Sequence, residues 1–288
     1  MKVLLTGGTG QVGAALKEAL APLGAVLAPR RDGMDLASPD SILRVVRSFR
    51  PELIVNAGAF TAVDLAESQP GIAATVNADA PAILAEEAKR LGAAIVQLST
   101  DYVFDGTKAA PYVETDAPAP LNAYGRTKLE GEKAVAASGA RHLILRTSWV
   151  YAAKGKNFLN TILRLAAERD ELRVVDDQRG APTSAGAIAE AVASLLEKDL
   201  SSGIFHMSCS GETTWYGLAV EALRLAGFDD AFHCRCHRRF RRSRYRHRGG
   251  AVGESRHDRD ELGSVTRRRG HAGVPAVHHG AETGAGAA

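Results

Sequence analysis

Residues 2–13 read KVLLTGGTGQVG, and this stretch decides the fold. Its apolar run Lys2–Thr6 predicts a short buried strand. Glycines follow directly, and Gln11–Leu23 then carries apolar side chains at helical spacing. A strand, a glycine turn and a helix in immediate succession predict the first half of a βαβ unit, and therefore a parallel sheet.

Beyond this start, short apolar runs alternate with helical patterns as far as residue 150. Ser38-Pro39-Asp40 supplies a capping serine and a proline at the first helical position, before an apolar helix face. We expect further strands over 25–28, 53–56, 94–99 and 142–147, and further helices over 78–91 and 122–137. Strands separated by helices of this length predict an α/β fold with a Rossmann-type doubly wound parallel sheet.

The pattern is looser between residues 151 and 232. Helices are expected near 158–168, 185–196 and 215–225, with short strands at 172–175 and 204–207. This segment is too short and too loosely patterned for a second large core. We predict a smaller C-terminal lobe that binds substrate and partly shares its sheet and helices with the first domain.

Residues 233–288 differ in composition from everything before them. They hold 13 Arg, no Lys and 5 Asp or Glu, a charge of +8, whereas residues 1–232 carry −5. They also hold 7 of the 9 His and 2 of the 3 Cys, without apolar periodicity. Such a segment cannot bury enough apolar surface to offset the entropy of ordering. We predict a tail outside the working fold, either disordered or produced by a change of reading frame.

The overall composition argues against several classes of protein. The 288 residues are 45% hydrophobic and 24% charged, which is typical of globular domains. No apolar run approaches the roughly 20 residues of a membrane span, and the N-terminus enters a strand without a signal-peptide pattern. Three cysteines provide no disulfide framework. We therefore expect a cytoplasmic protein with no membrane partner.

The glycines of the first turn have the spacing of a dinucleotide-binding fingerprint. Gly7, Gly10 and Gly13 permit a tight turn, close approach of the backbone to a pyrophosphate, and close packing of helix on strand. The helix N-terminus then presents free N–H groups and the positive end of its dipole to the anion. Glycine turns are common, but this one stands between a strand and a helix, as the fingerprint requires. Residues 1–150 are therefore predicted to form an NAD(P)-binding domain.

Two arginines after the second strand bear on the choice of cofactor. An acidic residue near this point binds the ribose of NAD, whereas an arginine accommodates the additional phosphate of NADP. Arg30 and Arg31 therefore favour NADPH, with NADH as the alternative, and a solvated loop would also account for the pair. Asp35 and Leu36 follow closely and are expected beside the adenine.

Tyr124 and Lys128 are four residues apart on a predicted helix, so their side chains share one face. A tyrosine has an ordinary pKa near ~10, and a lysine one turn away favours the phenolate and lowers that pKa. The pair could then serve as a general acid and base. An isolated pair of this kind is usually an exposed helix surface. Its position after the fourth strand of a chain with the glycine fingerprint favours the catalytic reading.

The ends of two predicted strands carry further candidates. Ser99-Thr100-Asp101-Tyr102 follows the fourth strand, at the edge where open parallel sheets bind ligands. A hydroxyl there can donate a hydrogen bond to a carbonyl that gains negative charge, although Ser, Thr and Asp are also ordinary turn residues. The small residues within Asn56–Thr61, after the third strand, would let a cofactor pass close to the backbone.

Several longer blocks identify a family. TGGTGQVG, MDLAS, VNAGAFTAVDLAES, STDYVFDG, YGRTKLEGE, LRTSWVY and DDQRGAPTSA, in this order and spacing, resemble the dTDP-4-dehydrorhamnose reductases, which are extended short-chain dehydrogenases/reductases. The similarity runs from Met1 to about Phe228. The last two blocks are much more specific than the glycine fingerprint.

The resemblance implies residue roles. Tyr124 would donate the proton, Lys128 would bind the nicotinamide ribose and tune the tyrosine, and Thr100 would assist at the substrate carbonyl. Thr100, Asp101 and Trp149 would contact the substrate, although Trp149 could instead anchor the two lobes. The remaining cofactor contacts implied are Gly10, Gln11, Val12, Asp35, Leu36, Ala59, Phe60, Thr61 and Leu98.

The implied reaction is NADPH-dependent reduction of the nucleotide-linked 4-ketosugar dTDP-4-dehydro-6-deoxy-L-mannose to dTDP-L-rhamnose, a precursor of cell-surface polysaccharides. A magnesium requirement and a homodimer are implied by the family alone, since the residues themselves indicate no metal site. One departure stands out. The Arg-Pro-x-Asn-Ser stretch near the family's C-terminus, which helps close the substrate side, is absent from residues 229–288.

Other functions remain open at this point. Relatives of this fold include nucleotide-sugar epimerases and dehydratases, and non-catalytic NADP-binding regulatory subunits. Intact Tyr124, Lys128 and Thr100 favour catalysis. His233-Cys-Arg-Cys-His237 looks like a zinc cluster, but its ligands crowd into five residues. The arginine-rich run matches no nucleic-acid-binding module, so we expect no nucleic-acid partner.

Overall fold

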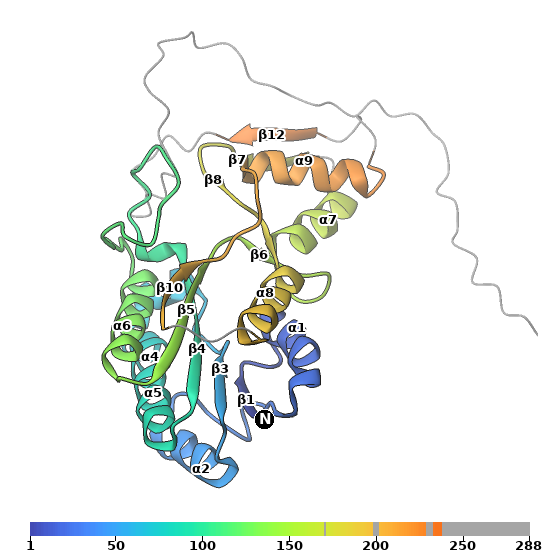
Figure 1. Ribbon diagram of the computed structural model, residues 1–288. Coiled ribbons are helices and arrows are strands. Elements are labelled where there is room, and N and C mark those ends of the chain that lie inside the picture. The colour runs from blue at the N-terminus through green and yellow to red at the C-terminus, as the bar shows by residue number, and fades with distance from the viewer. Residues whose placement is uncertain (170, 198–201, 229–232, 238–288) are drawn as a thin grey trace, which may run out of the picture.

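The computed structural model describes residues 1–169, 171–197, 202–228 and 233–237. Its centre is a six-stranded parallel sheet (Figure 1). Across the sheet the strands follow the order β10 (Gly203–His206), β5 (Arg141–Thr147), β4 (Ala94–Thr100), β3 (Leu53–Asn56), β1 (Lys2–Thr6) and β2 (Ala25–Leu27). The predicted doubly wound parallel sheet is confirmed.

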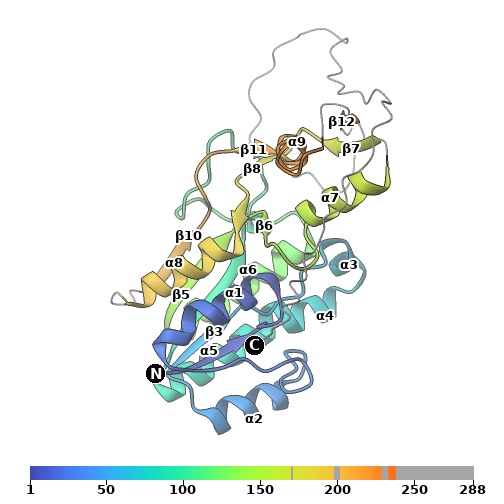
Figure 2. The same cartoon turned by 90° about the vertical axis from the view of Figure 1, so that its right-hand side faces the viewer.

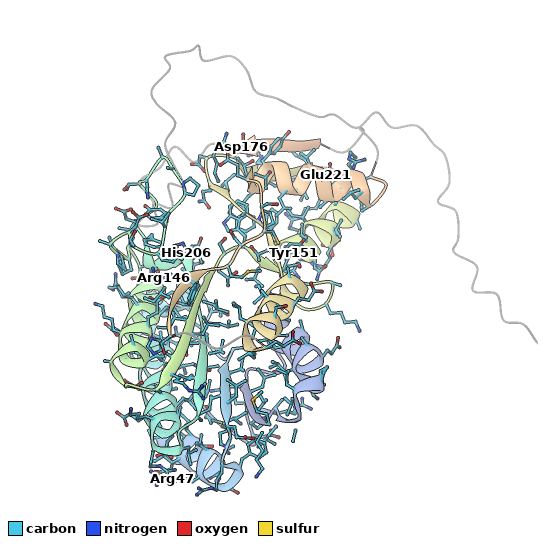
Figure 3. All side chains as sticks on the ribbon, viewed as in Figure 1. Arg47, Arg146, Tyr151, Asp176, His206 and Glu221 are labelled. Atoms are coloured by element: carbon cyan, nitrogen blue, oxygen red, sulfur yellow. The ribbon has the colours of Figure 1, made fainter. Side chains whose placement is uncertain are left out.

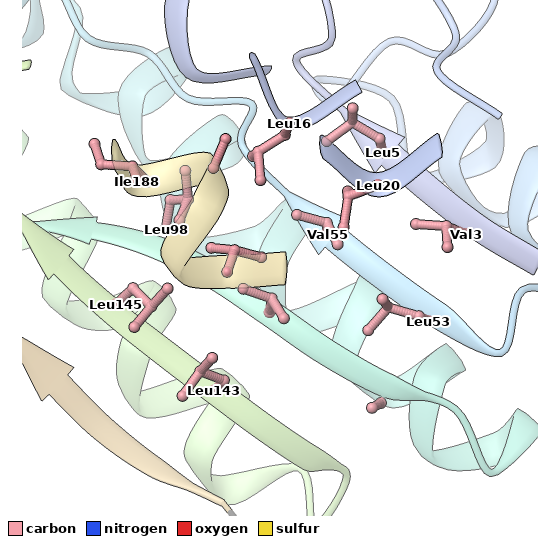
Figure 4. Packing of buried hydrophobic residues seen from close by; sticks show 14 residues of the cluster. Val3, Leu5, Leu16, Leu20, Leu53, Val55, Leu98, Leu143, Leu145 and Ile188 are labelled. Carbon is pink, nitrogen blue, oxygen red and sulfur yellow. The ribbon is translucent and has the colours of Figure 1, made fainter. Parts of the chain in front are cut away.

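Helices cover both faces of this sheet. On one face lie α1 (Gln11–Leu20) and α8 (Ala185–Glu197), and Figure 4 shows their apolar side chains against those of the strands. On the other face lie α2 (Pro39–Phe49), α5 (Ala80–Leu91) and α6 (Ala123–Ala137). The four inner strands, β1, β3, β4 and β5, are therefore buried from both sides, which is why their sequences are largely continuous apolar runs.

Local sequence accounts for where most of these helices begin. The Ser38 hydroxyl accepts from the Ser41 N–H at 3.3 Å, and Pro39 occupies the first turn of α2, as predicted. The segment before α5 differs from expectation. Two short helices, α3 (Val63–Ser68) and α4 (Pro70–Ala74), and a π-helical turn, η2 (Thr75–Asp79), precede it, so α5 begins at Ala80 rather than at residue 78.

A smaller lobe lies above the carboxyl ends of the strands (Figures 1 and 2). Its core joins α7 (Phe158–Glu168), β7 (Glu171–Val175) and α9 (Trp215–Leu225). Two small ladders complete it, formed by β8 (Arg179–Gly180) with β11 (Thr213–Thr214) and by β6 (Val150–Tyr151) with β9 (Thr183–Ser184). β10 belongs to the main sheet and α8 packs against it, although both come from residues 151–232. The two parts therefore share these elements, as predicted, and a domain boundary at residue 150 remains a prediction. No helix within the described ranges has the length and apolarity of a membrane span.

The prediction that the tail leaves the fold at residue 233 is wrong for its first five residues. His233–His237 form β12, which pairs in parallel with β7. Main-chain N–H and C=O groups make this pairing, so a segment of unfavourable composition can still add a strand to a sheet edge. Residues 238–288 lie outside the described residues, as do the side chains of the zinc-like cluster. The expectation of disorder or a frame change therefore remains a prediction for residues 238–288.

A buried ion pair joins α6 to β5 beneath the cavity described below. Arg146 Nη2 lies 2.7 Å from Glu132 Oε2, and these side chains are only 4% and 2% exposed. The Ser99 hydroxyl also donates to this carboxylate. Arg146 lies beside His206, its register partner on β10 (Figure 3). With both charges removed from water, each depends on the other for stabilisation.

Arg146→Leu should lower the free energy of unfolding by about 3–5 kcal/mol, because it leaves the Glu132 carboxylate buried without its partner. Urea denaturation measures this loss. The double variant Glu132→Leu/Arg146→Leu should be less destabilised than Arg146→Leu. The control is Arg164→Leu, which breaks an exposed pair with Glu168 and should change stability by less than about 1 kcal/mol. Equal losses for Arg146→Leu and Arg164→Leu would contradict the argument.

Candidate active site

A cavity of about 1030 Å³ opens at the carboxyl ends of β1, β3, β4 and β5. The strand order reverses between β1 and β3, at the kind of switch point where open parallel sheets bind ligands. The predicted site residues that line it are Gly7, Gly10, Gln11, Val12, Gly13, Arg31, Asp35, Leu36, Ala59, Phe60, Thr61, Leu98, Thr100, Asp101, Tyr124, Lys128 and Trp149. Arg30 does not line the cavity.

The glycine turn allows the backbone of β1 and α1 to approach closely. Gly7 has a φ of +67°, and a Cβ there would lie 2.6 Å from the Ala57 carbonyl. A Cβ on Gly13 would collide with the Gly7 carbonyl oxygen. Gly10 precedes α1, and no side chain caps that helix, whereas side chains cap α2, α6, α7 and α9. The first N–H groups of α1 are therefore available to an anion.

A loop from the smaller lobe lies against this turn. Asn157 Nδ2 donates to Gln11 Oε1 at 2.9 Å and to the Ala152 carbonyl at 2.7 Å. The Asn157 carboxamide oxygen also caps α7 by accepting from the Asn160 N–H. The loop thereby places Gly155 and Lys156 in the cavity wall. Asn157 thus ties α1, which packs on the main sheet, to the smaller lobe.

The two arginines after β2 have different positions. Arg31 lines the cavity, and its Nε lies 3.7 Å from Asp35 Oδ1. Both side chains are exposed, and Arg30 does not line the cavity, so contact of either arginine with a cofactor stays a prediction. The turn after β2 directs one of two adjacent side chains toward the cavity, and sequence proximity could not distinguish them.

Tyr124 and Lys128 project from one face of α6 into the cavity, as their spacing predicts. The Asn122 side chain caps this helix by accepting from the Gly125 N–H at 2.7 Å. Lys128 Nζ donates to the Leu98 carbonyl at 2.6 Å, which ties α6 to β4. Both side chains are buried. The structure therefore fixes the phenol and the ammonium relative to the end of β4.

The expected effect of Lys128 on the Tyr124 pKa is not what the structure shows. Burial raises the pKa of Tyr124 above its ordinary value, and only a hydrogen bond with Thr100 opposes this. Burial also lowers the pKa of Lys128 to about 8, against the nearby Glu132 carboxylate. The lysine instead directs its proton to the Leu98 carbonyl. The phenol is therefore held neutral, which suits a proton donor.

Thr100 and Asp101 lie at the end of β4, beside Tyr124. Thr100 Oγ1 accepts from the Tyr102 N–H at 3.2 Å and donates to Asp101 Oδ1 at 3.1 Å. Partial removal from water raises the pKa of Asp101 to about 6, despite the hydrogen bond from Thr100. The Tyr102 ring meets Tyr124 edge to face, with 5.3 Å between centroids. Thr100 is thus hydrogen-bonded both to Asp101 and to Tyr124, which joins the three side chains into one group.

Trp149 follows β5 and lines the same cavity. Its backbone has a φ of +47°, and its ring stacks on Trp215 from α9. Both readings of Trp149 therefore have a structural basis, since the residue faces the cavity and also joins the lobes.

The family model for the RmlD substrate binding domain matches residues 1–241. This chain belongs to the dTDP-4-dehydrorhamnose reductase family.

Individual relatives agree with the family model. The chain is 50% identical to the dTDP-4-dehydrorhamnose reductase of Burkholderia thailandensis, covering 76% of each chain. It is 49% identical to that of Escherichia coli, covering 79% of this chain and 80% of the relative. The family model extends beyond Phe228, where we expected the resemblance to end, but residues 242–288 lie outside it.

Solved structures give the same result. The reductase of Clostridium acetobutylicum superposes with a TM-score of 0.77 at 40% identity, covering 80% of this chain and 81% of that one. The reductase of Bacillus anthracis, solved with NADP, superposes with a TM-score of 0.75 at 35% identity, covering 78% and 81%. A Thermotoga maritima UDP-glucose 4-epimerase, at 19% identity and a TM-score of 0.71, shares the fold alone.

The cavity fits a nicotinamide dinucleotide of the kind bound by the family. The glycine turn leaves the N-terminus of α1 open to a pyrophosphate. Thr147 also lines the cavity, and its buried hydroxyl has no partner among the described residues. Within the described ranges no three His, Cys, Asp or Glu side chains gather into a group that could hold a metal ion.

Sequence reasoning missed several residues of the cavity wall. Tyr102 stands within the STDY block but was not assigned a role, although its place at the strand end was a usable signal. Thr147 ends a predicted strand in the same way. Lys156 lies in a loop of the smaller lobe and lines the cavity beside Asn157, which binds Gln11. No local pattern could have indicated it.

Gly13→Ala should weaken the binding of NADP(H) at least about tenfold, a loss of 1.4 kcal/mol or more. The added methyl would force the Gly7 carbonyl away and distort the phosphate turn. Isothermal titration calorimetry measures the affinity. The control is Gly71→Ala, because a Cβ at Gly71 meets nothing within 4 Å. Unchanged affinity in a folded Gly13→Ala protein would show that the turn does not hold the cofactor.

Proposed function

We propose that this chain catalyses the NADPH-dependent reduction of dTDP-4-dehydro-6-deoxy-L-mannose to dTDP-L-rhamnose. One observation carries the proposal. Tyr124, Thr100 and Lys128 meet in the same cavity as the uncapped glycine turn. Relatives at about half identity, named for this reaction, support the substrate. NADPH oxidation by the purified protein with this ketosugar nucleotide is the direct test, and no oxidation would refute the proposal.

Each residue has a distinct part in the proposed reaction. The bound nicotinamide supplies the hydride. Tyr124 gives its phenolic proton to the oxygen of the carbonyl, and burial keeps that proton in place at neutral pH. Thr100, hydrogen-bonded to Tyr124, is placed to assist the carbonyl as negative charge develops on it. Asp101, beside it, would contact the sugar and would orient the Thr100 hydroxyl.

Lys128 acts through its charge and its position. When protonated, it can donate to the Leu98 carbonyl and to a ribose hydroxyl, because an ammonium has three protons. The intact catalytic group favours an enzyme over a non-catalytic NADP-binding subunit. A stoichiometric use of NADPH would distinguish a reductase from an epimerase or dehydratase that recycles its cofactor.

Tyr124→Phe should reduce kcat about 10²–10⁴-fold, because the ring still packs but the transferable proton is lost. NADPH affinity should stay nearly unchanged. Steady-state kinetics and calorimetry measure the two effects. The control is Tyr112→Phe, whose hydroxyl binds Asp105 outside the cavity and whose loss should spare turnover. Retention of more than half of the activity by Tyr124→Phe would remove Tyr124 from the mechanism.

The rate of reduction should depend on the protonation of Lys128. Because the pKa of Lys128 is lowered to about 8, kcat/KM should fall as the pH rises through that value. The neighbouring phenol titrates well above this range. Lys128→Met should lower the rate and remove this basic limb, whereas Lys128→Arg should keep the charge and move the limb upward. An unchanged limb in Lys128→Met would assign the titration to another group.

The preference for NADPH over NADH should depend on Arg31 and not on Arg30. Arg31 lines the cavity near Asp35, where a ribose phosphate would be placed, and Arg30 does not. Arg31→Ala should shift the ratio of kcat/KM values toward NADH, and Arg30→Ala is the matched control. If neither substitution changes the ratio, the two arginines form a solvated loop and do not select the cofactor.

A further inference from the structure

The chain contains two tryptophans, and they stack on each other. The centroids of Trp149 and Trp215 are 3.6 Å apart, and their planes differ by 5°. Trp149 follows β5 of the main sheet, whereas Trp215 begins α9 of the smaller lobe. Trp149 lines the cavity and Trp215 does not. The stack therefore connects the cavity wall to a residue behind it.

Trp149 is held in an unfavourable backbone conformation. Its φ of +47° lies in the left-handed region, which bulky residues rarely adopt. The Thr183 N–H donates to the Trp149 carbonyl at 3.2 Å. Gly180 leaves room for the indole, because a Cβ there would collide with the ring. The surrounding structure thus imposes this conformation on the indole.

Trp215 is itself held on several sides. Its indole N–H donates to Gln178 Oε1 at 3.1 Å, and the Phe158 ring packs against it at 4.5 Å between centroids. The hydroxyl of Thr214, the preceding residue, caps α9 and also donates to Asp176. Asp176, Gln178 and Gly180 all belong to the DDQRGAPT block. That block therefore builds the support on which the two indoles lie.

We propose that Trp215 is a positioning residue, which holds the Trp149 indole as the wall against which the sugar of the nucleotide substrate packs. The proposal rests on the proposed function. The sugar is favoured as the occupant because Thr147, two residues before Trp149, is the register partner of Thr100, beside which the proposed reaction places the carbonyl. An aromatic face binds the apolar face of a pyranose ring, and a fixed ring does so without losing rotamer freedom on binding.

A double-mutant cycle on the affinity for dTDP-L-rhamnose tests this role. Trp215→Leu should raise the Kd roughly threefold to tenfold, the range that an aromatic pair supplies. Trp149→Leu should raise it at least as much, and the double variant should be no worse than Trp149→Leu, because Trp215 acts only through Trp149. Additive losses, or an unchanged Kd in Trp215→Leu, would overturn the proposal. With dTDP alone, which lacks the sugar, the loss should be much smaller, and an equal loss would overturn the assignment to the sugar.

Two glycine variants test the stack without replacing either tryptophan. One should displace the Trp149 ring, and the other is a control that should leave the stack undisturbed. Stacked indoles give an exciton couplet in the circular dichroism spectrum, and the chain has no other tryptophan to mask it. Gly180→Ala should weaken the couplet and raise the Kd for dTDP-L-rhamnose, because the methyl would displace the Trp149 ring. Gly186→Ala, whose Cβ meets only Ser184 Oγ at 3.9 Å, should change neither. A weakened couplet in Gly180→Ala with unchanged affinity would overturn the proposal.

The readouts keep this proposal separate from the proposed function. The Kd for dTDP-L-rhamnose is measured without turnover, so the cycle gives a result even if the wild-type protein does not oxidise NADPH. NADPH affinity should be the same in all the tryptophan variants, and a parallel loss of NADPH affinity would indicate general disruption and overturn the positioning role. Trp215→Phe keeps an aromatic face and should restore most of the affinity that Trp215→Leu loses.

Discussion

The close approach of Gly13 to the Gly7 carbonyl is the contact on which the site depends. Because neither position tolerates a side chain there, α1 starts directly against the end of β1. The helix has no side-chain cap, so its first N–H groups face the cavity. A ligand phosphate can supply what a capping residue supplies elsewhere in this fold. The same turn positions Gln11, through which Asn157 holds the smaller lobe against the sheet.

A second set of close approaches positions the reacting groups. Gly125 and Gly131 of α6 lie so close to the Tyr102 and Asn77 carbonyls that a Cβ at either would collide with them. This brings α6 near enough for Lys128 to donate to the Leu98 carbonyl at the end of β4. Burial then acts on the phenol and the ammonium in opposite directions, and it favours the neutral form of each. A proton donor and a readily titrated lysine follow from one packing arrangement.

The smaller lobe contributes support rather than reacting groups. Its conspicuous block, DDQRGAPT, supplies the hydrogen-bond partners of Thr214 and Trp215 and the space that the Trp149 ring occupies. In the sequence this block identifies the family without revealing what it does. The contacts of this block can be seen only in the folded chain, because they join it to Trp149 and to Thr214 and Trp215, which lie in separate segments of the sequence.

The sequence by itself determined the strands of the main sheet, most helices and many members of the cavity wall. Buried parallel strands need continuous apolar runs, and the glycine spacing has few alternative structural meanings once it lies between a strand and a helix. Only the tertiary structure decided which of Arg30 and Arg31 faces the cavity, the direction of the Tyr124 pKa shift, and the pairing of β12 with β7. These depend on burial, on side-chain direction in a loop, and on main-chain pairing between distant segments. No local pattern of residues encodes these three features, because each depends on the groups that the completed fold packs around the residues concerned.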